Sequence, residues 1–184
     1  MSNKEALREL QQRLAQRMQA AREHQAPGAA WLAVECGGQG LLFSLKHAAE
    51  IFTPVPLKPL PYAKPWMMGV ANLRGGLFTV VDLAVFLGLR APQAPGSAEA
   101  RADAGQARLV SLNPDMNSNC ALLVDRLAGL RSEEQLKAQP LTAAEQEGRP
   151  RFAGQRMLDA QGRSWQQVHL DALSKHEQFL QVVV

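Results

Sequence analysis

The side chains that could perform catalysis or hold a metal ion are few and far apart in this sequence. Four histidines occur, and none stands at metal-ligand spacing from another histidine or from a cysteine. The sequence contains no HExxH zinc motif, no G-x-S-x-G nucleophile elbow and no P-loop. The glycine-rich run Gly37-Gly38-Gln39-Gly40 lies between two predicted strands, which favours a turn over a phosphate cradle. We therefore predict no catalytic residues, no metal and no cofactor.

Three residues remain for a dispersed active site, namely Asp82, His169 and Cys120. Asp82 and Asp171 could act as a paired acid and base, but a carboxylate at the end of a strand more often caps the following helix. The apolar neighbours of Cys120 are expected to raise its pKa and make the thiol unreactive. We expect Cys36 and Cys120 to be buried free thiols of a reducing cytosol. The sequence thus gives no positive evidence for an enzyme, which is kept only as an alternative.

The charge and hydropathy patterns argue against two common classes of partner. The net charge is +3 and the isoelectric point is near 9.1, but the cations are scattered and aromatic residues make up only 5%. A nucleic-acid surface concentrates cations on one face with aromatic side chains between them. A small β-barrel that binds nucleic acid is therefore only an alternative. No run approaches the roughly 18 apolar residues of a membrane span, and no secretion signal is apparent, so we expect a cytoplasmic chain without direct membrane insertion.

The first part of the chain is predicted to be one amphipathic helix over residues 2–24. Ser2 and Glu5 match a capping box, and Pro27-Gly28 ends the helix. The apolar stripe of this helix consists of Leu7, Leu10, Leu14, Met18 and Ala21. We expect this apolar stripe to pack on the helix's own domain rather than to bind a partner, because packing is the commoner role of such a stripe. We assign residues 1–27 to this helix.

The remaining domain, residues 28–180, has the pattern of short strands separated by glycine and proline turns. Strands are expected at residues 31–36, 41–45, 47–51 (strand or turn), 77–83, 107–112, 120–127, 151–159 and 164–170. Prolines between residues 54 and 65 place that segment at an edge or on the surface, because proline cannot donate to a central ladder. Residues 91–106 form a low-complexity loop that we expect to be mobile. This pattern predicts a mainly β fold, a small barrel or sandwich.

Two segments of this domain are similar to each other. Val80-Val81-Asp82-Leu83-Ala84 and Val168-His169-Leu170-Asp171-Ala172 each read as a strand that enters a short helix. Asp82 and Asp171 are predicted to cap these two helices, and the second helix is expected to run through Leu180. Two barrels in one chain would account for the repetition.

The residues from Trp66 to Leu83 join a glycine-rich turn to an apolar strand and contain few polar groups. Asn72 is expected to form the turn. The guanidinium of Arg74 would offer fixed donors to carboxylates of a partner, and Gly69 would let a partner side chain approach the backbone closely. The residues alone leave two roles open for Arg74, partner contact and tying down a neighbouring loop. The segment suits a surface that holds another protein better than a reactive pocket.

The segment from Leu41 to Gly88 resembles the CheW family, the coupling proteins of bacterial chemosensory arrays. The matching features are Ala49-Glu50-Ile51, the proline-rich run into Leu60-Pro61-Tyr62-Ala63, Trp66-Met67-Met68-Gly69-Val70-Ala71-Asn72-Leu73-Arg74-Gly75, and Val80-Val81-Asp82-Leu83 followed by Phe86-Leu87-Gly88. They occur in order and at the family's spacing. Looser similarity at residues 120–127 and 151–154 extends the match over roughly residues 30–175.

The resemblance implies a fold of two intertwined five-stranded SH3-like barrels, here with an N-terminal helix and a short C-terminal helix. It implies a non-catalytic adaptor that joins a CheA-type histidine kinase to methyl-accepting chemoreceptors. Such an adaptor is cytoplasmic and associates with membrane-bound receptor arrays through protein contacts. The receptor-binding features of the family fall on Glu50, Gly69 and Arg74, and we include Asn72 of the same turn. No residue is assigned to the kinase-facing surface.

The leading helix and the alanine-rich loop at 91–106 differ from the short flagellar form of the family. A helical N-terminal extension is more similar to the pilus-associated PilI type, which serves type IV pilus twitching motility. A flagellar chemotaxis coupling protein is the alternative.

Overall fold

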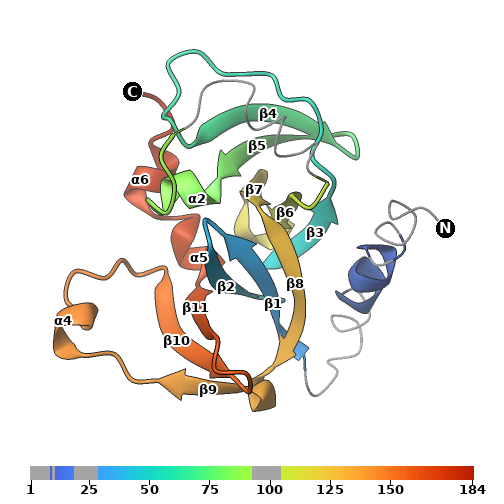
Figure 1. Ribbon diagram of the computed structural model, residues 1–184. Helices are drawn as coiled ribbons and strands as arrows, with labels where there is room; N and C mark the ends of the chain where they lie inside the picture. Colours follow the sequence, from blue (N-terminus) through green and yellow to red (C-terminus); the bar gives the residue numbers. More distant parts are fainter. Residues whose placement is uncertain (1–8, 10, 19–28, 93–104) are drawn as a thin grey trace.

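The computed structural model describes residues 9, 11–18, 29–92 and 105–184 (Figure 1). The described strands form two sheets, so the prediction of a mainly β fold is confirmed. The first sheet has the order β8-β1-β2-β11-β10-β9 and contains β1 (Ala29–Cys36), β2 (Gln39–Ser44), β8 (Arg126–Ser132), β9 (Leu136–Gln139), β10 (Ala153–Asp159) and β11 (Ser164–Val168). The second has the order β3-β6-β7-β5-β4 and contains β3 (Ala48–Phe52), β4 (Met67–Leu73), β5 (Gly76–Asp82), β6 (Arg108–Leu112) and β7 (Cys120–Val124).

We call the two curved sheets the first and the second barrel. In the first barrel, β8 and β9 are separated only by the 3-10 turn η2 (Glu133–Gln135). If they are taken as one bent strand, each barrel has five strands, as the fold prediction states.

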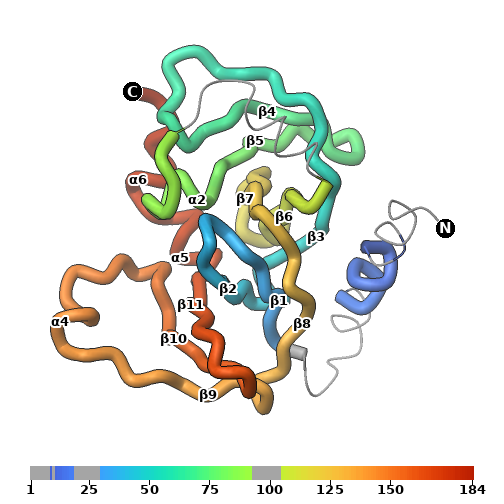
Figure 2. Tube along the Cα trace, in the orientation of Figure 1, coloured from blue at the N-terminus to red at the C-terminus, as the bar shows by residue number. Residues whose placement is uncertain are grey.

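The two barrels share one strand arrangement. The hairpin β1–β2 of the first barrel pairs in parallel with β11, and the hairpin β6–β7 of the second pairs in parallel with β5. In both barrels the parallel strand belongs to another hairpin, β10–β11 or β4–β5. The predicted internal repetition is therefore confirmed. The barrels are intertwined because the chain starts the first barrel, builds the second and then returns to finish the first (Figure 2).

Short helices follow the parallel strands, and only one of the two predicted caps is correct. Asp82 is the N-cap of α2 (Leu83–Phe86), and its Oδ1 accepts a hydrogen bond of 3.3 Å from the Val85 N–H. The prediction for Asp171 is wrong, because the N-cap of α5 (Leu170–Leu173) is His169 and Asp171 lies inside the first turn. The closing helix is also divided, since α6 (Glu177–Leu180) begins separately after its own N-cap, His176.

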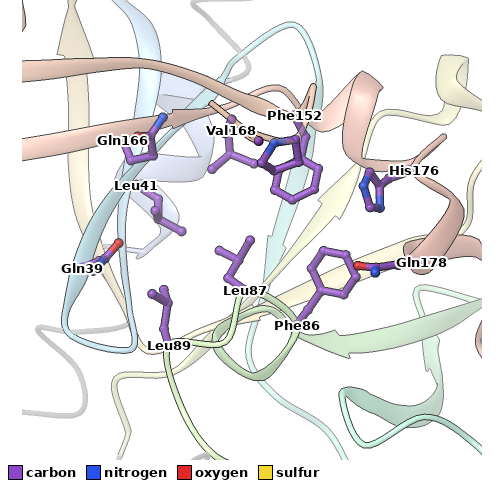
Figure 3. A pocket seen from close by; sticks show the side chains of 13 residues that line it. Gln39, Leu41, Phe86, Leu87, Leu89, Phe152, Gln166, Val168, His176 and Gln178 are labelled. Atoms are coloured by element: carbon purple, nitrogen blue, oxygen red, sulfur yellow. The ribbon is translucent and has the colours of Figure 1, made fainter. Parts of the chain in front are cut away.

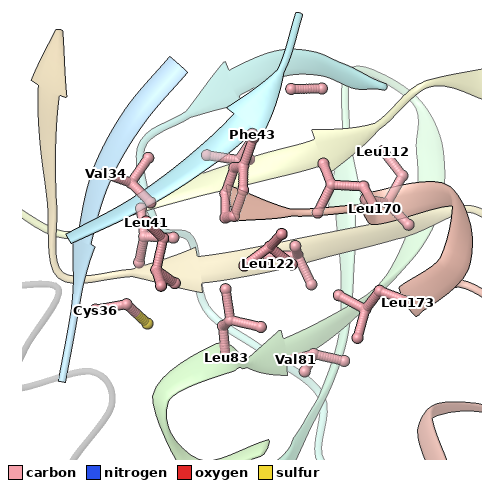
Figure 4. Packing of buried hydrophobic residues seen from close by; sticks show 14 of the residues in the cluster. Val34, Cys36, Leu41, Phe43, Val81, Leu83, Leu112, Leu122, Leu170 and Leu173 are labelled. Atoms are coloured by element: carbon pink, nitrogen blue, oxygen red, sulfur yellow. The ribbon is translucent and has the colours of Figure 1, made fainter. Parts of the chain in front are cut away.

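The main hydrophobic core lies between the barrels and receives side chains from both (Figure 4). Its fully buried members include Val34, Leu41, Phe43, Leu83, Leu112, Leu122, Leu170 and Leu173. Each barrel also has a smaller core of its own, with Leu42 and Trp165 in the first barrel and Leu73 and Leu109 in the second. The barrels therefore share their largest apolar cluster, and neither can be removed without exposing the other.

The N-terminal helix packs on the domain where the structure describes it. Residues 11–18 are helical, Met18 is buried, and Leu14 packs against the main core. The side-chain amide of Gln11 contacts the guanidinium of Arg108 in β6. These contacts support the prediction that the apolar stripe of the N-terminal helix packs on the helix's own domain. The rest of the helix predicted at 2–24, including the Ser2–Glu5 capping box, lies outside the described residues, as do residues 93–104 of the loop predicted to be mobile.

Several strands differ from the sequence prediction. The strands β4, β8 and β9 were not predicted, and the strand expected at 120–127 ends at Val124 because the chain passes from one barrel to the other at Asp125. The remaining short elements are η1 (Pro114–Met116) and α4 (Ala143–Gln146). No helix among the described residues is long and apolar enough to cross a membrane.

Candidate protein-interaction site

The turn between β4 and β5 presents Arg74 on a defined backbone. Arg74 and Gly75 form a two-residue loop with φ values of 48° and 82°, which is the conformation of a tight hairpin turn. The Oδ1 of Asn72 accepts a 2.9 Å hydrogen bond from the Gly75 N–H, so the prediction of Asn72 as a turn former is confirmed. The side chain of Arg74 is therefore carried by a hydrogen-bonded tight turn.

Arg74 is paired with Glu50, a second charged residue predicted for the site. Its Nη1 lies 2.5 Å from Oε2 of Glu50, and the two side chains are 77% and 47% exposed. The guanidinium also lies 5.9 Å from the centre of the Phe52 ring. Since Glu50 and Phe52 belong to β3, this pair joins the two edges of the second barrel's sheet. Arg74 therefore does tie down a neighbouring segment, which is one of the two roles left open for it. Because the ion pair is exposed, a partner could also contact it.

The reason predicted for Gly69, close approach by a partner, is wrong. Gly69 is buried, its φ is 135°, and a Cβ at this position would overlap the carbonyl oxygen of Lys58. Lys58 lies in the proline-rich segment and exchanges two backbone hydrogen bonds of 2.9 Å with Val70. The segment that approaches Gly69 thus comes from the chain itself. We call residues 53–66 the strap, and Gly69 holds the strap against β4.

A groove of about 560 Å³ lies between the barrels (Figure 3). One wall comes from β2 and β11 of the first barrel, and the opposite wall comes from α2 and the residues that follow it. The labelled apolar side chains in Figure 3 point into the space from both walls; they are Leu41, Phe86, Leu87, Leu89, Phe152 and Val168. The lining also includes Gln39, Gln166, Gln178 and one titratable side chain, His176, so it offers no pair of groups for acid–base chemistry.

Aromatic rings support one end of this groove. Phe86 packs edge-on against Trp66 and Phe179, with ring centres 5.2 Å apart in both pairs. The His176 ring lies 5.0 Å from Phe152 in a T-shaped arrangement. These contacts join the strap, α2, α6 and the loop before β10. These aromatic contacts therefore support the wall of the groove that α2 forms.

The residues of the enzymatic alternative are not gathered into a centre. Cys120 is paired in register with Thr79, whereas Asp82 is paired with Leu123, so about 10 Å of strand separates the two. His169 follows β11 in the other barrel. Burial raises the pKa of the Cys120 thiol to about 12, as the apolar neighbours predicted, and both cysteines are free and buried. Among the described residues no group of three potential ligands could hold a metal ion.

Many of the arginines are used in ion pairs with carboxylates of the same chain. The pairs are Arg74 with Glu50, Arg90 with Asp125, Arg126 and Arg163 with Glu35, and Arg156 with Glu145, at 2.5 to 2.8 Å. A phosphate backbone requires cations that are not already neutralised. The arrangement therefore favours protein contact over nucleic-acid binding.

Comparison with known proteins identifies the domain. A family model described as "CheW-like domain" matches residues 30–178, which is most of the chain. The chain belongs to the CheW-like domain family. The resemblance predicted from the motif around Arg74 is thus confirmed.

Relatives of this CheW-like domain agree with the assignment. The chain is 32% identical over 62 residues to a "Chemotaxis protein CheW" from Rhizobium meliloti (strain 1021), a match that covers 34% of the chain and 40% of the relative. It is also 32% identical over 59 residues to a "Probable chemotaxis protein CheW" from Rhizobium etli, covering 32% of the chain and 38% of the relative. The chain thus spans about two fifths of the length of the curated relatives it matches.

A solved structure supports the CheW-like fold. The scaffolding protein TtCheW from Thermoanaerobacter tengcongensis superimposes with a TM-score of 0.57 at 13% identity, covering 78% of this chain and 92% of that chain. At this identity the likeness shows the fold, and it confirms the predicted CheW-like architecture. The family match, by itself, agrees with the prediction of a non-catalytic protein.

Proposed function

We propose that this CheW-like chain is a non-catalytic adaptor that couples methyl-accepting chemoreceptors to a CheA-type histidine kinase. The observation that carries the proposal is the exposed Arg74–Glu50 pair on a rigid turn of a CheW-like domain. In this role the chain works in the cytoplasm and reaches membrane-bound receptor arrays through protein contacts alone.

The receptor contact is assigned to Glu50, Asn72 and Arg74, with Gly69 acting indirectly. Arginine donates in a fixed planar fork, which suits carboxylates on the surface of a receptor helix. Glu50 contacts the Nη1 edge of the guanidinium, and the high exposure of Arg74 leaves its side chain within reach of a partner. Gly69 supports this surface by keeping the strap in place beside β4.

The test is charge reversal at Arg74. Arg74→Asp is expected to weaken co-sedimentation with receptor-containing membranes about tenfold or more, because a charged contact is replaced by repulsion. Its free energy of unfolding should change by no more than about 1 kcal/mol, since an exposed ion pair contributes little. Lys137→Asp, an exposed charge reversal on β9, is the matched control and should bind normally. Normal receptor binding by folded Arg74→Asp would remove Arg74 from the contact.

A charge swap separates partner contact from the internal pair. Arg74→Glu combined with Glu50→Arg restores an ion pair between β3 and the turn. If receptor binding stays low in this double variant, then the native arrangement of charges at positions 50 and 74 is needed for the partner. Full recovery of binding would show that the pair acts only by joining β3 to the turn.

We further propose that the output is type IV pilus twitching motility. The support is the helix at residues 11–18, which precedes the domain and packs on it through Leu14 and Met18, as in a helical N-terminal extension of the PilI type. Deletion of the gene should abolish surface twitching and leave swimming unchanged. Loss of swimming with normal twitching would favour the flagellar alternative.

A further inference from the structure

The strand β3 contains a β-bulge at the proposed receptor contact. Its register against β6 shifts between Ala48 and Ile51. There two residues of β3, Ala49 and Glu50, lie opposite a single residue of β6, Ser111. An extra residue in one strand of an antiparallel pair bends that strand and changes the direction in which its side chains point. Glu50, which pairs with the guanidinium of the β4–β5 turn, is thus one of the two bulged residues.

The bulge decides which way Glu50 faces. Ala48 is buried in the main core and Ile51 packs against it, although three steps along a regular strand would place them on opposite faces. Phe52 instead packs against the second barrel's own core. Glu50 and Phe52 share this face, and Arg74 pairs with the carboxylate of the one and lies 5.9 Å from the ring centre of the other. The bulge therefore lets the apolar residues enter the main core while the carboxylate meets the guanidinium.

The hydroxyl of Ser111 lies at the centre of the bulge. Its Oγ accepts a 2.9 Å hydrogen bond from the Glu50 N–H and donates one of 3.4 Å to the Glu50 carbonyl oxygen. Ser111 is only 3% exposed, so its hydroxyl is a buried polar group that contacts both backbone groups of one residue. Removing one member of a buried hydrogen bond leaves the other without compensation for its lost water.

The core alone does not fix the orientation of Glu50. Packing in the main core holds β3 at Ala48 and at Ile51, which lie before and after the bulged residues. Between these two points the Glu50 side chain is 47% exposed, so no tight packing surrounds its carboxylate. The backbone direction at Glu50 determines where this carboxylate points, and the Ser111 hydroxyl holds that backbone.

We propose that Ser111 is a positioning residue for the receptor contact: by holding the backbone of Glu50 in the bulge, its hydroxyl directs the Glu50 carboxylate toward the Arg74 guanidinium. Ser111 is buried, so it acts on a partner only through Glu50. The inference rests on the proposed adaptor function for the identity of that partner, a methyl-accepting receptor, but not for the geometry.

The test combines receptor binding with a nuclear magnetic resonance signal from the site itself. Nuclear Overhauser effects between the Arg74 side chain and the Phe52 ring report whether the guanidinium is held at β3. Ser111→Ala is expected to weaken these effects and to reduce receptor co-sedimentation about threefold to tenfold, which corresponds to the loss of one buried hydrogen bond. Ser111→Thr keeps the hydroxyl and should retain both the effects and the binding.

Ser174→Ala is the matched control. Ser174 is 7% exposed, and its Oγ donates a 3.0 Å hydrogen bond to the Asp171 carbonyl at the end of α5. The control thus removes a buried serine hydroxyl outside β3 and β6. It is expected to lower the melting temperature without changing the Arg74–Phe52 effects or receptor binding. If Ser111→Ala does not fold, Ser111→Cys keeps the size of the side chain with weaker hydrogen bonding, and should show the same losses to a smaller extent.

The outcomes separate positioning from simple stabilisation. Loss of the Arg74–Phe52 effects and of binding in Ser111→Ala, with both retained in Ser111→Thr, supports the proposal. A folded Ser111→Ala protein that keeps either the effects or the binding would overturn it. An equal loss of binding in Ser174→Ala would also overturn it, because binding would then follow stability. If the unsubstituted protein does not bind receptor, the adaptor proposal fails, and the Overhauser effects still decide whether Ser111 positions Glu50.

Discussion

At the scale of single residues, Glu145 shows how local hydrogen bonds control a charge on the surface. Its carboxylate accepts from the Thr142 N–H at 2.9 Å and from Arg156 at 2.8 Å, and these contacts lower its pKa from an ordinary 4.5 to about 2. Thr142 and Glu145 form the capping box of α4. The charge is therefore part of what holds this one-turn helix in place.

We predict that Glu145→Gln reduces the loss of stability in acid. Between pH 4.5 and about 2 the unfolded chain binds more protons at Glu145 than the folded chain. The stability that this group contributes is complete above pH 4.5 and is lost as the pH falls toward 2. Glutamine keeps the capping box but does not titrate. Urea midpoints at pH 5 and pH 3 should therefore differ less for Glu145→Gln than for the unsubstituted protein or for Glu134→Gln, an exposed control; an equal difference would contradict the prediction.

Single residues were predictable where the responsible partner is near in sequence. Asn72 and Asp82 contact backbone groups three residues ahead, so turn and cap rules identified both roles. Gly69 was misread because its close neighbour, Lys58, lies eleven residues earlier and meets it only in the folded barrel. Asp171 was misread because β11 ends at Val168, two residues before the end of the predicted strand, so the helix begins earlier.

At the scale of elements, the strap connects β3 to β4 and covers the edge of the second barrel. Its backbone is tied to β4 by the two hydrogen bonds between Lys58 and Val70. Farther along, the Lys64 N–H donates to the Val182 carbonyl at 2.8 Å. The strap therefore depends on Gly69 at one point and on the end of the described chain at another.

We predict that Gly69→Ala destabilises the protein more than Gly75→Ala. Both glycines have positive φ values, but a Cβ at Gly75 meets nothing within 4 Å, whereas one at Gly69 meets the Lys58 carbonyl. Gly75→Ala should cost about 1–2 kcal/mol from its backbone conformation alone. Gly69→Ala should cost more and should speed amide exchange at Lys58 and Val70. Equal costs, measured by urea unfolding, would show that the strap is not held by this contact.

Elements with a clear apolar run were predictable, and those without one were not. The hairpin β1–β2 and the strands β6, β10 and β11 follow the expected ranges closely. The strand β4 contains Gly69 and runs into the turn residues that follow it, and no strand was predicted there. The strand β8 lacks a buried face, since all its described side chains are half-buried or exposed. The break at Asp125 has no local signal, because it is caused by the change of barrel.

At the scale of the whole molecule, the core between the barrels makes the domain one cooperative unit. Leu122 of β7 is fully buried in this cluster, and residues of β1, β2 and α5 pack in the same cluster. The sequence pattern predicted strands and their repetition, whereas the intertwining of the two barrels came only from the family resemblance, and the pairing of β2 with β11 that produces it came only from the structure. Rules applied to a single sequence describe residues that are close together along the chain. They could not predict this pairing, because it joins residues more than a hundred positions apart.

We predict that Leu122→Ala lowers the free energy of unfolding by about 2–5 kcal/mol, because it opens a cavity in a fully buried site. Unfolding should remain a single transition, with tryptophan fluorescence and far-ultraviolet circular dichroism giving the same midpoint. Leu77→Ala, at a side chain that is 64% exposed, is the control and should change stability by about 0.5 kcal/mol or less. Two separated transitions would show that the barrels unfold independently.

The return of the chain to the first barrel also sets an order of events during synthesis on the ribosome. All strands of the second barrel, from Ala48 to Val124, are contiguous and can assemble while translation continues. The hairpin β1–β2 emerges earlier but must wait for β11, its parallel neighbour, which is made about 120 residues later. Until then the apolar face of that hairpin has no permanent cover, so the nascent chain has a long interval in which a chaperone would protect it.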